Sequence, residues 1–132
     1  MNIIRPFKRT RIAPTPSGFL HLGNIFSFSL TAGLAAKHDT EILLRIDDLD
    51  RQRTRQHYLQ DIFDSLRFLS LPWQLGPSDV ADFERTYSQQ YRRPLYERAL
   101  RELAAGGHAF ACICTRQQLQ SEGLESGCVS GC

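Results

Sequence analysis

The stretch of sequence that decides the fold is residues 11–24, which read Arg11-Ile12-Ala13-Pro14-Thr15-Pro16-Ser17-Gly18-Phe19-Leu20-His21-Leu22-Gly23-Asn24. It begins inside a short strand predicted over Lys8–Pro14 and leads into a helix predicted over Ile25–Ala36, with Asn24 as N-cap candidate. That helix is apolar almost all round, which is typical of a helix buried on every face. The apolar run Glu41–Ile46 then has the pattern of a buried parallel strand. Strand, helix and strand at this spacing predict a βαβ unit.

The loop within this stretch has the ingredients of a phosphate site. In an open parallel sheet, ligands bind outside the carboxyl ends of the strands, beside helix N-termini with free N–H groups. Gly18 and Gly23 permit close backbone approach, His21 can donate to phosphate oxygens, and Arg11 can grip a carboxylate. Proline, serine and glycine also make ordinary turns, and the spacing alone leaves both interpretations open.

Two further helices are predicted downstream. An amphipathic helix is predicted over Thr54–Leu71, with apolar residues at helical spacing, and a second over Tyr91–Ala105, stopped by Gly106 and Gly107. A polar loop is expected over Gly76–Glu84, and a strand over Ala109–Thr115.

Composition excludes several classes of protein. The chain has 132 residues, a net charge of +2, 42% hydrophobic and 23% charged residues, which excludes disordered and collagen-like proteins. No apolar run approaches the roughly 18–20 residues that span a bilayer. The basic leader lacks a small-residue cleavage site, so we expect a cytoplasmic protein that does not engage membranes. Separately, we expect it to be a monomer.

The four cysteines, Cys112, Cys114, Cys128 and Cys132, form two close pairs near the end of the chain. Paired thiolates on short loops are typical of a tetrahedral structural zinc site. Two disulfides are the alternative, but a cytoplasmic setting and the strain of a bridge across one residue disfavour them. The spacing therefore predicts a structural Zn²⁺.

Several motifs in order resemble the class I glutamyl-tRNA synthetases. Residues 11–24 resemble their R-x-A-P-S-P-[ST]-G-x-L-H-x-G stretch, which contains the "HIGH" motif, here at 21–24. Residues 45–50 look like their R-I-E-D-[TI]-D block, and residues 112–115 look like their C-x-C-T. Within the family, the chain is most similar to glutamyl-queuosine tRNA(Asp) synthetases, which lack an anticodon-binding domain. Ordinary glutamyl-tRNA synthetase is the alternative.

The resemblance implies an α/β fold. Residues 1–105 would form the N-terminal half of a Rossmann-like catalytic domain, and residues 106–132 the start of a zinc-bearing, acceptor-end-binding insertion. It also implies a two-step reaction with ATP and Mg²⁺. Glutamate and ATP give glutamyl-adenylate and pyrophosphate, and the glutamyl group then moves to RNA. The acceptor would be queuosine in the anticodon of tRNA(Asp), or the 3′ end of tRNA(Glu).

The resemblance also assigns roles by motif position. His21 and Asn24 would be catalytic and, with Gly23, would bind ATP. The residues assigned to glutamate are Arg11, Ala13, Thr15 and Asp47. Asp47 stands where the family has a Glu that holds the substrate α-ammonium, so its side chain is one methylene shorter. The residues alone would make Asp47, Asp48 and Asp50 a solvated acidic turn.

One part of the family's active site has no counterpart in the sequence. The KMSKS loop needs two lysines, and the only lysines, Lys8 and Lys37, lie before and inside the first βα unit. We therefore expect these 132 residues alone to bind ATP and glutamate weakly and not to aminoacylate. Two other interpretations remain open: a non-catalytic, zinc-stabilised tRNA-binding module, and a fragment without a separate role.

Overall fold

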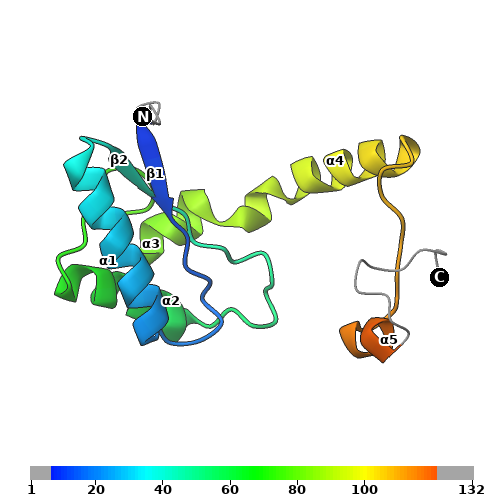
Figure 1. Cartoon of the computed structure of the whole chain (residues 1–132), viewed down its shortest axis with the longest axis horizontal. Helices are drawn as coiled ribbons and strands as arrows, with labels where there is room; N and C mark the ends of the chain where they lie inside the picture. The colour runs from blue at the N-terminus through cyan, green and yellow to red at the C-terminus, as the bar shows by residue number, and fades with distance from the viewer. Residues whose placement is uncertain (1–6, 122–132) are drawn as a thin grey trace, which may run out of the picture. The chain divides into compact units, whose positions relative to one another are not determined.

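The predicted βαβ unit is present in the computed structural model, which describes residues 7–121. Strand β1 (Arg9–Ile12) pairs in parallel with strand β2 (Glu41–Leu44), and helix α1 (Leu22–Lys37) connects them (Figure 1). Both strands end sooner than predicted, although the N–H of Arg45 still donates to the carbonyl of Ile12 at 2.9 Å. Pro14 has no N–H to continue the ladder, so the chain leaves the sheet as a loop.

A later loop covers the other edge of β2. The N–H of Leu44 donates to the carbonyl of Leu75 at 2.8 Å, and the N–H of Ile42 donates to Gln74 Oε1 at 2.8 Å. Gly76 follows with φ of +105°, and a Cβ at this position would lie 2.2 Å from the carbonyl oxygen of Leu44. Glycine is therefore required here both by the backbone conformation and by the close approach to β2.

Helix α1 begins earlier than predicted. His21, not Asn24, is the N-cap: its imidazole Nδ1 accepts from the N–H of Gly23 at 3.1 Å, and Asn24 Oδ1 accepts from the N–H of His21 at 3.2 Å. This reciprocal pair is a capping box, in which the third helical residue also contributes a side chain. The prediction of Asn24 as N-cap was wrong because the capping residue is a histidine, which is outside the usual set.

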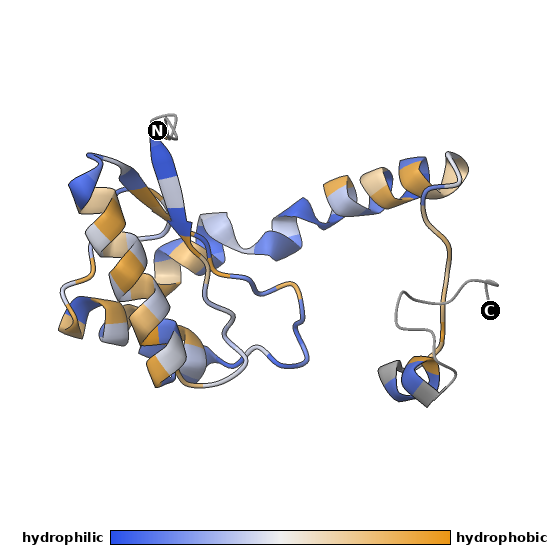
Figure 2. Cartoon of the chain, in the orientation of Figure 1, coloured by the Kyte–Doolittle hydropathy of each residue, from blue (hydrophilic) through white to orange (hydrophobic). Residues whose placement is uncertain are grey.

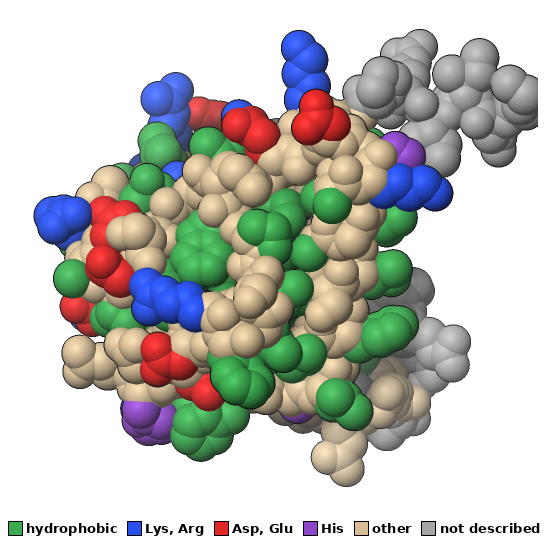
Figure 3. Space-filling view, turned by 90° about the vertical axis from the view of Figure 1, so that its left-hand side faces the viewer, with side chains coloured by type: hydrophobic (Ala, Val, Ile, Leu, Met, Phe, Trp, Pro, Cys, Tyr) green, Lys and Arg blue, Asp and Glu red, His purple; other side chains and the backbone are tan. Residues whose placement is uncertain are grey.

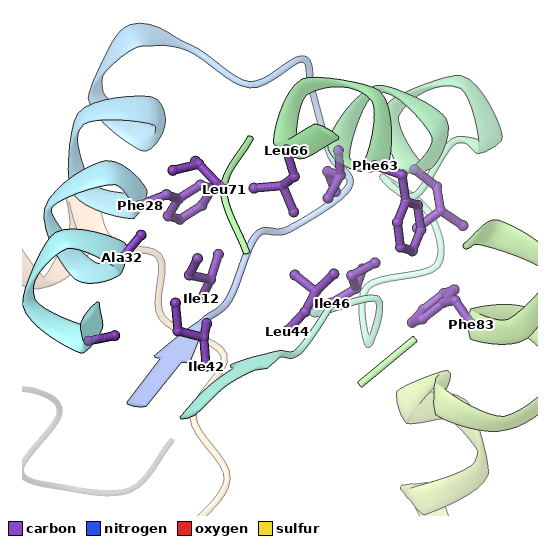
Figure 4. Close-up of a cluster of buried hydrophobic side chains, with 13 residues drawn as sticks. Ile12, Phe28, Ala32, Ile42, Leu44, Ile46, Phe63, Leu66, Leu71 and Phe83 are labelled. Carbon is purple, nitrogen blue, oxygen red and sulfur yellow. The ribbon is translucent and has the colours of Figure 1, made fainter. Parts of the chain in front are cut away.

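The core lies between these strands and helix α2 (Gln56–Phe68). Ile12 of β1 and Ile42 of β2 face Phe28 and Ala32 of α1 in Figure 4. Helix α2 adds the apolar face that the sequence predicts, with buried residues Leu59, Ile62, Phe63 and Leu66. The apolar periodicity of α2 was thus a reliable guide to its buried face.

The prediction that α1 is buried on every face is wrong. Its buried residues are Phe28, Ala32 and Ala35, whereas a second apolar row is 46% to 84% exposed and consists of Leu22, Phe26, Leu30 and Leu34. Apolar residues, in orange, recur along α1 in Figure 2, and apolar side chains reach the surface of the face shown in Figure 3. Among residues 7–121, only one side of α1 has elements to pack against.

The segment after Gly76 is more ordered than the polar loop that was predicted. It contains α3 (Val80–Asp82), a π-helical turn η1 (Phe83–Tyr87) and a 3-10 turn η2 (Gln89–Arg92). Asp79 caps α3, and the N–H of Asp82 donates to its carboxylate at 2.8 Å. That hydrogen bond lowers the pKa of Asp79 from its ordinary 3.8. Phe83 is buried in the core, so an apolar anchor orders this segment.

The chain divides into two compact units between Arg92 and Arg93, here called the N-terminal and C-terminal units. The C-terminal unit contains α4 (Arg93–Ala105) and α5 (Arg116–Ser121). The strand predicted over Ala109–Thr115 is wrong: this segment has no strand partner among the described residues, and a strand needs one. Across residues 7–121, no helix has both the length and the apolar character to cross a membrane.

Candidate functional site

The predicted loop surrounds a cavity of about 280 Å³ in the N-terminal unit. Its lining includes Ala13, Thr15, His21 and Asn24, together with Ser17 and Gly18 of the turn. Thr15 and His21 are exposed, and Ala13 and Asn24 are half-buried. The structure therefore brings four of the predicted site residues to one hollow, at the end of β1 and beside the first turn of α1.

His21 is oriented by the helix that it caps. Because Nδ1 accepts from Gly23, the neutral ring carries its proton on Nε2, which is then a donor for a ligand oxygen. A Cβ at Gly23 would lie 3.0 Å from His21 Cε1 and 3.1 Å from Nδ1, so any larger residue would displace the ring. The N-terminus of α1 adds partial positive charge at the same place. The arrangement suits an anionic ligand such as a phosphate.

Asp47 lies beside this loop. Its N–H donates to the carbonyl of Pro14 at 2.9 Å, which ties the acidic segment after β2 to the loop after β1. The half-buried carboxylate accepts from Gln89 Nε2 at 2.7 Å and lies 3.7 Å from an Arg45 guanidinium nitrogen. The sequence predicted Asp47 as a site residue but gave no signal for Gln89, which it left between a loop and a helix.

Arg11 is exposed on β1, next to the loop. No hydrogen bond or ion pair joins its side chain to another residue within the described range 7–121. A guanidinium without an internal partner retains its full capacity for a bidentate carboxylate. The geometry is thus compatible with the role assigned to Arg11, and nothing inside the described part of the chain competes for it.

Helix α2 also contacts the predicted loop, at the residues just before His21. The N–H of Leu20 donates to Asp61 Oδ2 at 3.0 Å, and the ring of Phe19 packs edge-on against Tyr58 at 4.9 Å. Both contacts act immediately before His21 in the sequence. The sequence analysis did not predict a role for Asp61. A carboxylate next to the buried apolar row of α2 breaks the apolar pattern, and this break was the available signal.

A larger cavity of about 550 Å³ lies elsewhere in the N-terminal unit. Its walls include Asp48, Arg51, Phe83 and Tyr91. None of the predicted site residues lines it. The predicted site residues that line a cavity therefore lie at the smaller hollow.

The predicted zinc site is only half within the described residues. Cys112 is exposed and Cys114 is half-buried, and both belong to the C-terminal unit, whereas Cys128 and Cys132 lie outside the described residues. No cluster of three or more His, Cys, Asp or Glu side chains suited to a metal occurs within residues 7–121. Two thiols do not make a tetrahedral site, so the zinc ligand set stays a prediction.

Two parallel strands joined by a helix whose N-terminus follows the first strand define an α/β domain, a class in which ligands bind at the carboxyl ends of the strands. A family profile described as "tRNA synthetases class I (E and Q), catalytic domain" matches residues 8–127. The chain belongs to this family.

Two of the relatives that the chain matches are both named glutamate--tRNA ligase. The chain is 40% identical over 112 residues to the glutamate--tRNA ligase of Pseudomonas entomophila. The aligned region covers 85% of this chain and 22% of that protein. The Psychrobacter glutamate--tRNA ligase is 39% identical over 113 residues, covering 86% and 22%. The crystal structure of glutamate-tRNA synthetase from Elizabethkingia anophelis aligns with a TM-score of 0.65 and 26% identity, covering 86% of this chain and 23% of the other. This chain thus spans about a fifth of the length of these relatives.

Proposed function

We propose that this chain supplies the N-terminal part of a glutamate-activating tRNA synthetase active site. The observation that carries the proposal is the hydrogen bond from the N–H of Asp47 to the carbonyl of Pro14, which joins the acidic segment to the HIGH-type loop. Family membership and the name shared by the relatives support glutamate as the amino acid. The queuosine-specific member, which the motifs favoured, has less support than an ordinary glutamate--tRNA ligase.

The residues divide the work between the two substrates. Arg11, which precedes Ala13 and Thr15 in the sequence, would pair with the side-chain carboxylate of glutamate, and Asp47 would attract its α-ammonium. His21 Nε2 and the N-terminus of α1, which includes Gly23, would hold ATP phosphates, with Asn24 in the lining of the hollow. Mg²⁺ would accompany ATP as a counter-ion of its phosphates. Catalysis would then consist of positioning and electrostatic stabilisation at phosphorus.

The residues of this chain account for only part of the proposed ATP site. The hollow of about 280 Å³ has a helix N-terminus and a histidine but no lysine in its lining. A triphosphate needs more cationic partners than these, so the rest of the pocket would come from the part of a full-length enzyme that this chain does not contain. We expect the 132-residue chain alone not to aminoacylate.

The cysteines favour a second candidate, the glutamyl-queuosine tRNA(Asp) synthetase. The C-x-C pair at Cys112 and Cys114 followed by the C-x-x-x-C pair at Cys128 and Cys132 is similar to the zinc ligands of that subfamily. With all four thiolates, the C-terminal unit would hold a structural Zn²⁺ with no open coordination position. Elemental analysis of the reduced protein would show about one zinc per chain if this holds, and none if it does not.

A chimera tests both candidates. Residues 8–132, which include all four cysteines, would replace the corresponding segment of the Pseudomonas entomophila ligase, and transfer of labelled glutamate to RNA would be measured. We expect charging of tRNA(Glu), with the unmodified ligase as positive control. Charging of queuosine-containing tRNA(Asp) instead would establish the second candidate. A folded chimera that charges neither RNA would contradict the proposal.

A further inference from the structure

Three consecutive residues, Ser88, Gln89 and Gln90, grip the acidic segment after β2, and we call them the SQQ clamp. Ser88 Oγ donates to Asp48 Oδ2 at 2.5 Å, and the N–H of Gln89 donates to Asp48 Oδ1 at 2.7 Å. Gln90 Nε2 donates to the carbonyls of Asp48 at 2.8 Å and Leu49 at 3.1 Å. Asp48 is 5% exposed, and both of its carboxylate oxygens accept hydrogen bonds from the clamp, so this carboxylate has a structural role.

Gln89 differs from the rest of the clamp because its side chain reaches Asp47. Gln89 Nε2 donates to Asp47 Oδ1 at 2.7 Å, and Gln89 is only 6% exposed. A buried amide has few alternative rotamers, so it fixes the direction of the carboxylate that it contacts. Arg45 is the charged neighbour of Asp47, and its guanidinium nitrogen lies 3.7 Å from Asp47 Oδ2, a longer contact than that of Gln89.

The charge of the donor matters as much as its position. An amide donates a hydrogen bond without bringing a positive charge, so Gln89 adds nothing to the charge that Arg45 already places beside Asp47. A lysine or arginine in the same place would neutralise the carboxylate and repel an ammonium group.

We propose that Gln89 is a positioning and specificity-determining residue for the α-ammonium group of the amino-acid substrate, acting by orienting the Asp47 carboxylate without neutralising it. This rests on the proposed function. It explains how an aspartate, one methylene shorter than the glutamate expected from the resemblance, can present a fixed carboxylate at the site. The orientation comes from a separate segment and not from the length of the Asp47 side chain.

Gln89 and Gln90 provide a matched pair for the test. Both are glutamines of the SQQ clamp and both donate a side-chain amide to residues 47–49, but only Gln89 contacts the Asp47 carboxylate. The substitutions Gln89→Met and Gln90→Met remove one amide each and preserve side-chain length. Kinetics of glutamate-dependent pyrophosphate exchange would be measured in the chimera described above, with thermal unfolding as a check that each variant folds.

For Gln89→Met we expect KM for glutamate to rise about tenfold, as for loss of one hydrogen bond to a charged group, with kcat and KM for ATP within about twofold. Gln89→Lys should raise KM for glutamate further. Gln90→Met should lower thermal stability but leave KM for glutamate within about twofold. A merely structural role for Gln89 would make the two methionine variants alike.

An unchanged KM in Gln89→Met, or an equal rise in Gln90→Met, overturns the inference while the active parent keeps the proposed function intact. A folded parent without glutamate-dependent exchange overturns the proposed function and this inference with it. If Gln89→Met does not fold, NMR of the 132-residue chain decides: Asp47→Asn should shift the side-chain amide signals of Gln89 but not those of Gln90. Equal shifts, or none, refute the contact on which the inference rests.

Discussion

The two units of the chain differ in what their apolar residues do. In the N-terminal unit, β1, β2, α1 and α2 enclose a shared core in which Ile62 and Phe63 are fully buried. In the C-terminal unit, α4 has an apolar row but no buried residue among those described. Amphipathic periodicity is present in both α2 and α4, yet within residues 7–121 only α2 buries its apolar face. The pattern therefore predicts that a helix has a face to bury, not that this chain buries it.

Core substitutions should separate the two units most strongly. Phe63→Ala should lower the free energy of unfolding by about 3–5 kcal/mol, because Phe63 is fully enclosed. Leu100→Ala in α4 should change it by less than about 0.5 kcal/mol, because Leu100 is 59% exposed. Urea unfolding followed by circular dichroism measures both. Equal losses would contradict the distinction between a packed and an unpacked helix.

The contact of Gly76 with β2 gives the next largest effect. Gly76→Ala should cost about 2–4 kcal/mol, because the new Cβ meets the Leu44 carbonyl and φ is positive. Gly18→Ala is the matched control, since no atom lies within 4 Å of a Cβ placed at Gly18. Thermal unfolding of both variants checks this, and a stable Gly76→Ala protein would show that β2 tolerates a shift at its edge.

The link between α2 and the HIGH-type loop should give a smaller, local effect. Asp61→Leu removes the acceptor for the Leu20 N–H, so the amide of Leu20 should exchange about tenfold faster with solvent. Asp64→Leu, on the exposed side of the same helix, should leave it unchanged. Hydrogen exchange by NMR measures this difference. Unaltered exchange in Asp61→Leu would mean that the aromatic contacts of Phe19 suffice to hold the loop.

The smallest effect expected is the pH dependence at Asp79. Its pKa is lowered in the folded chain, mainly by the hydrogen bond from the N–H of Asp82, so its ionised form stabilises the fold. That contribution is fully present above the ordinary value of 3.8 and is lost as pH falls through the lower folded pKa. Asp79→Ala should therefore narrow the stability difference between pH 7 and pH 3. An unchanged stability difference between pH 7 and pH 3 would show that Asp79 does not contribute to it.

Local chemistry made much of the site predictable from sequence. The turn residues from Pro14 to Gly18 and the apolar runs on either side were enough for the βαβ unit, and motif position led to His21 and Asp47. Residues that act through long-range contacts were not predictable. Gln89 lies 42 residues from Asp47 in the sequence, and Asp61 lies 41 residues from Leu20. The predictions of a fully buried α1 and of a strand near Cys112 failed for a related reason. Burial and strand formation both depend on a packing or pairing partner and not on local propensity alone.

We propose that the N-terminal unit carries one half of a glutamate-activating site and does not act without the other half. Glutamate-dependent pyrophosphate exchange, measured on the 132-residue chain and on the chimera side by side, tests it most directly. The account predicts no turnover for the chain alone, turnover for the chimera, and a loss of about a hundredfold in the chimera with His21→Ala. Turnover by the chain alone, or a chimera indifferent to His21→Ala, would contradict it.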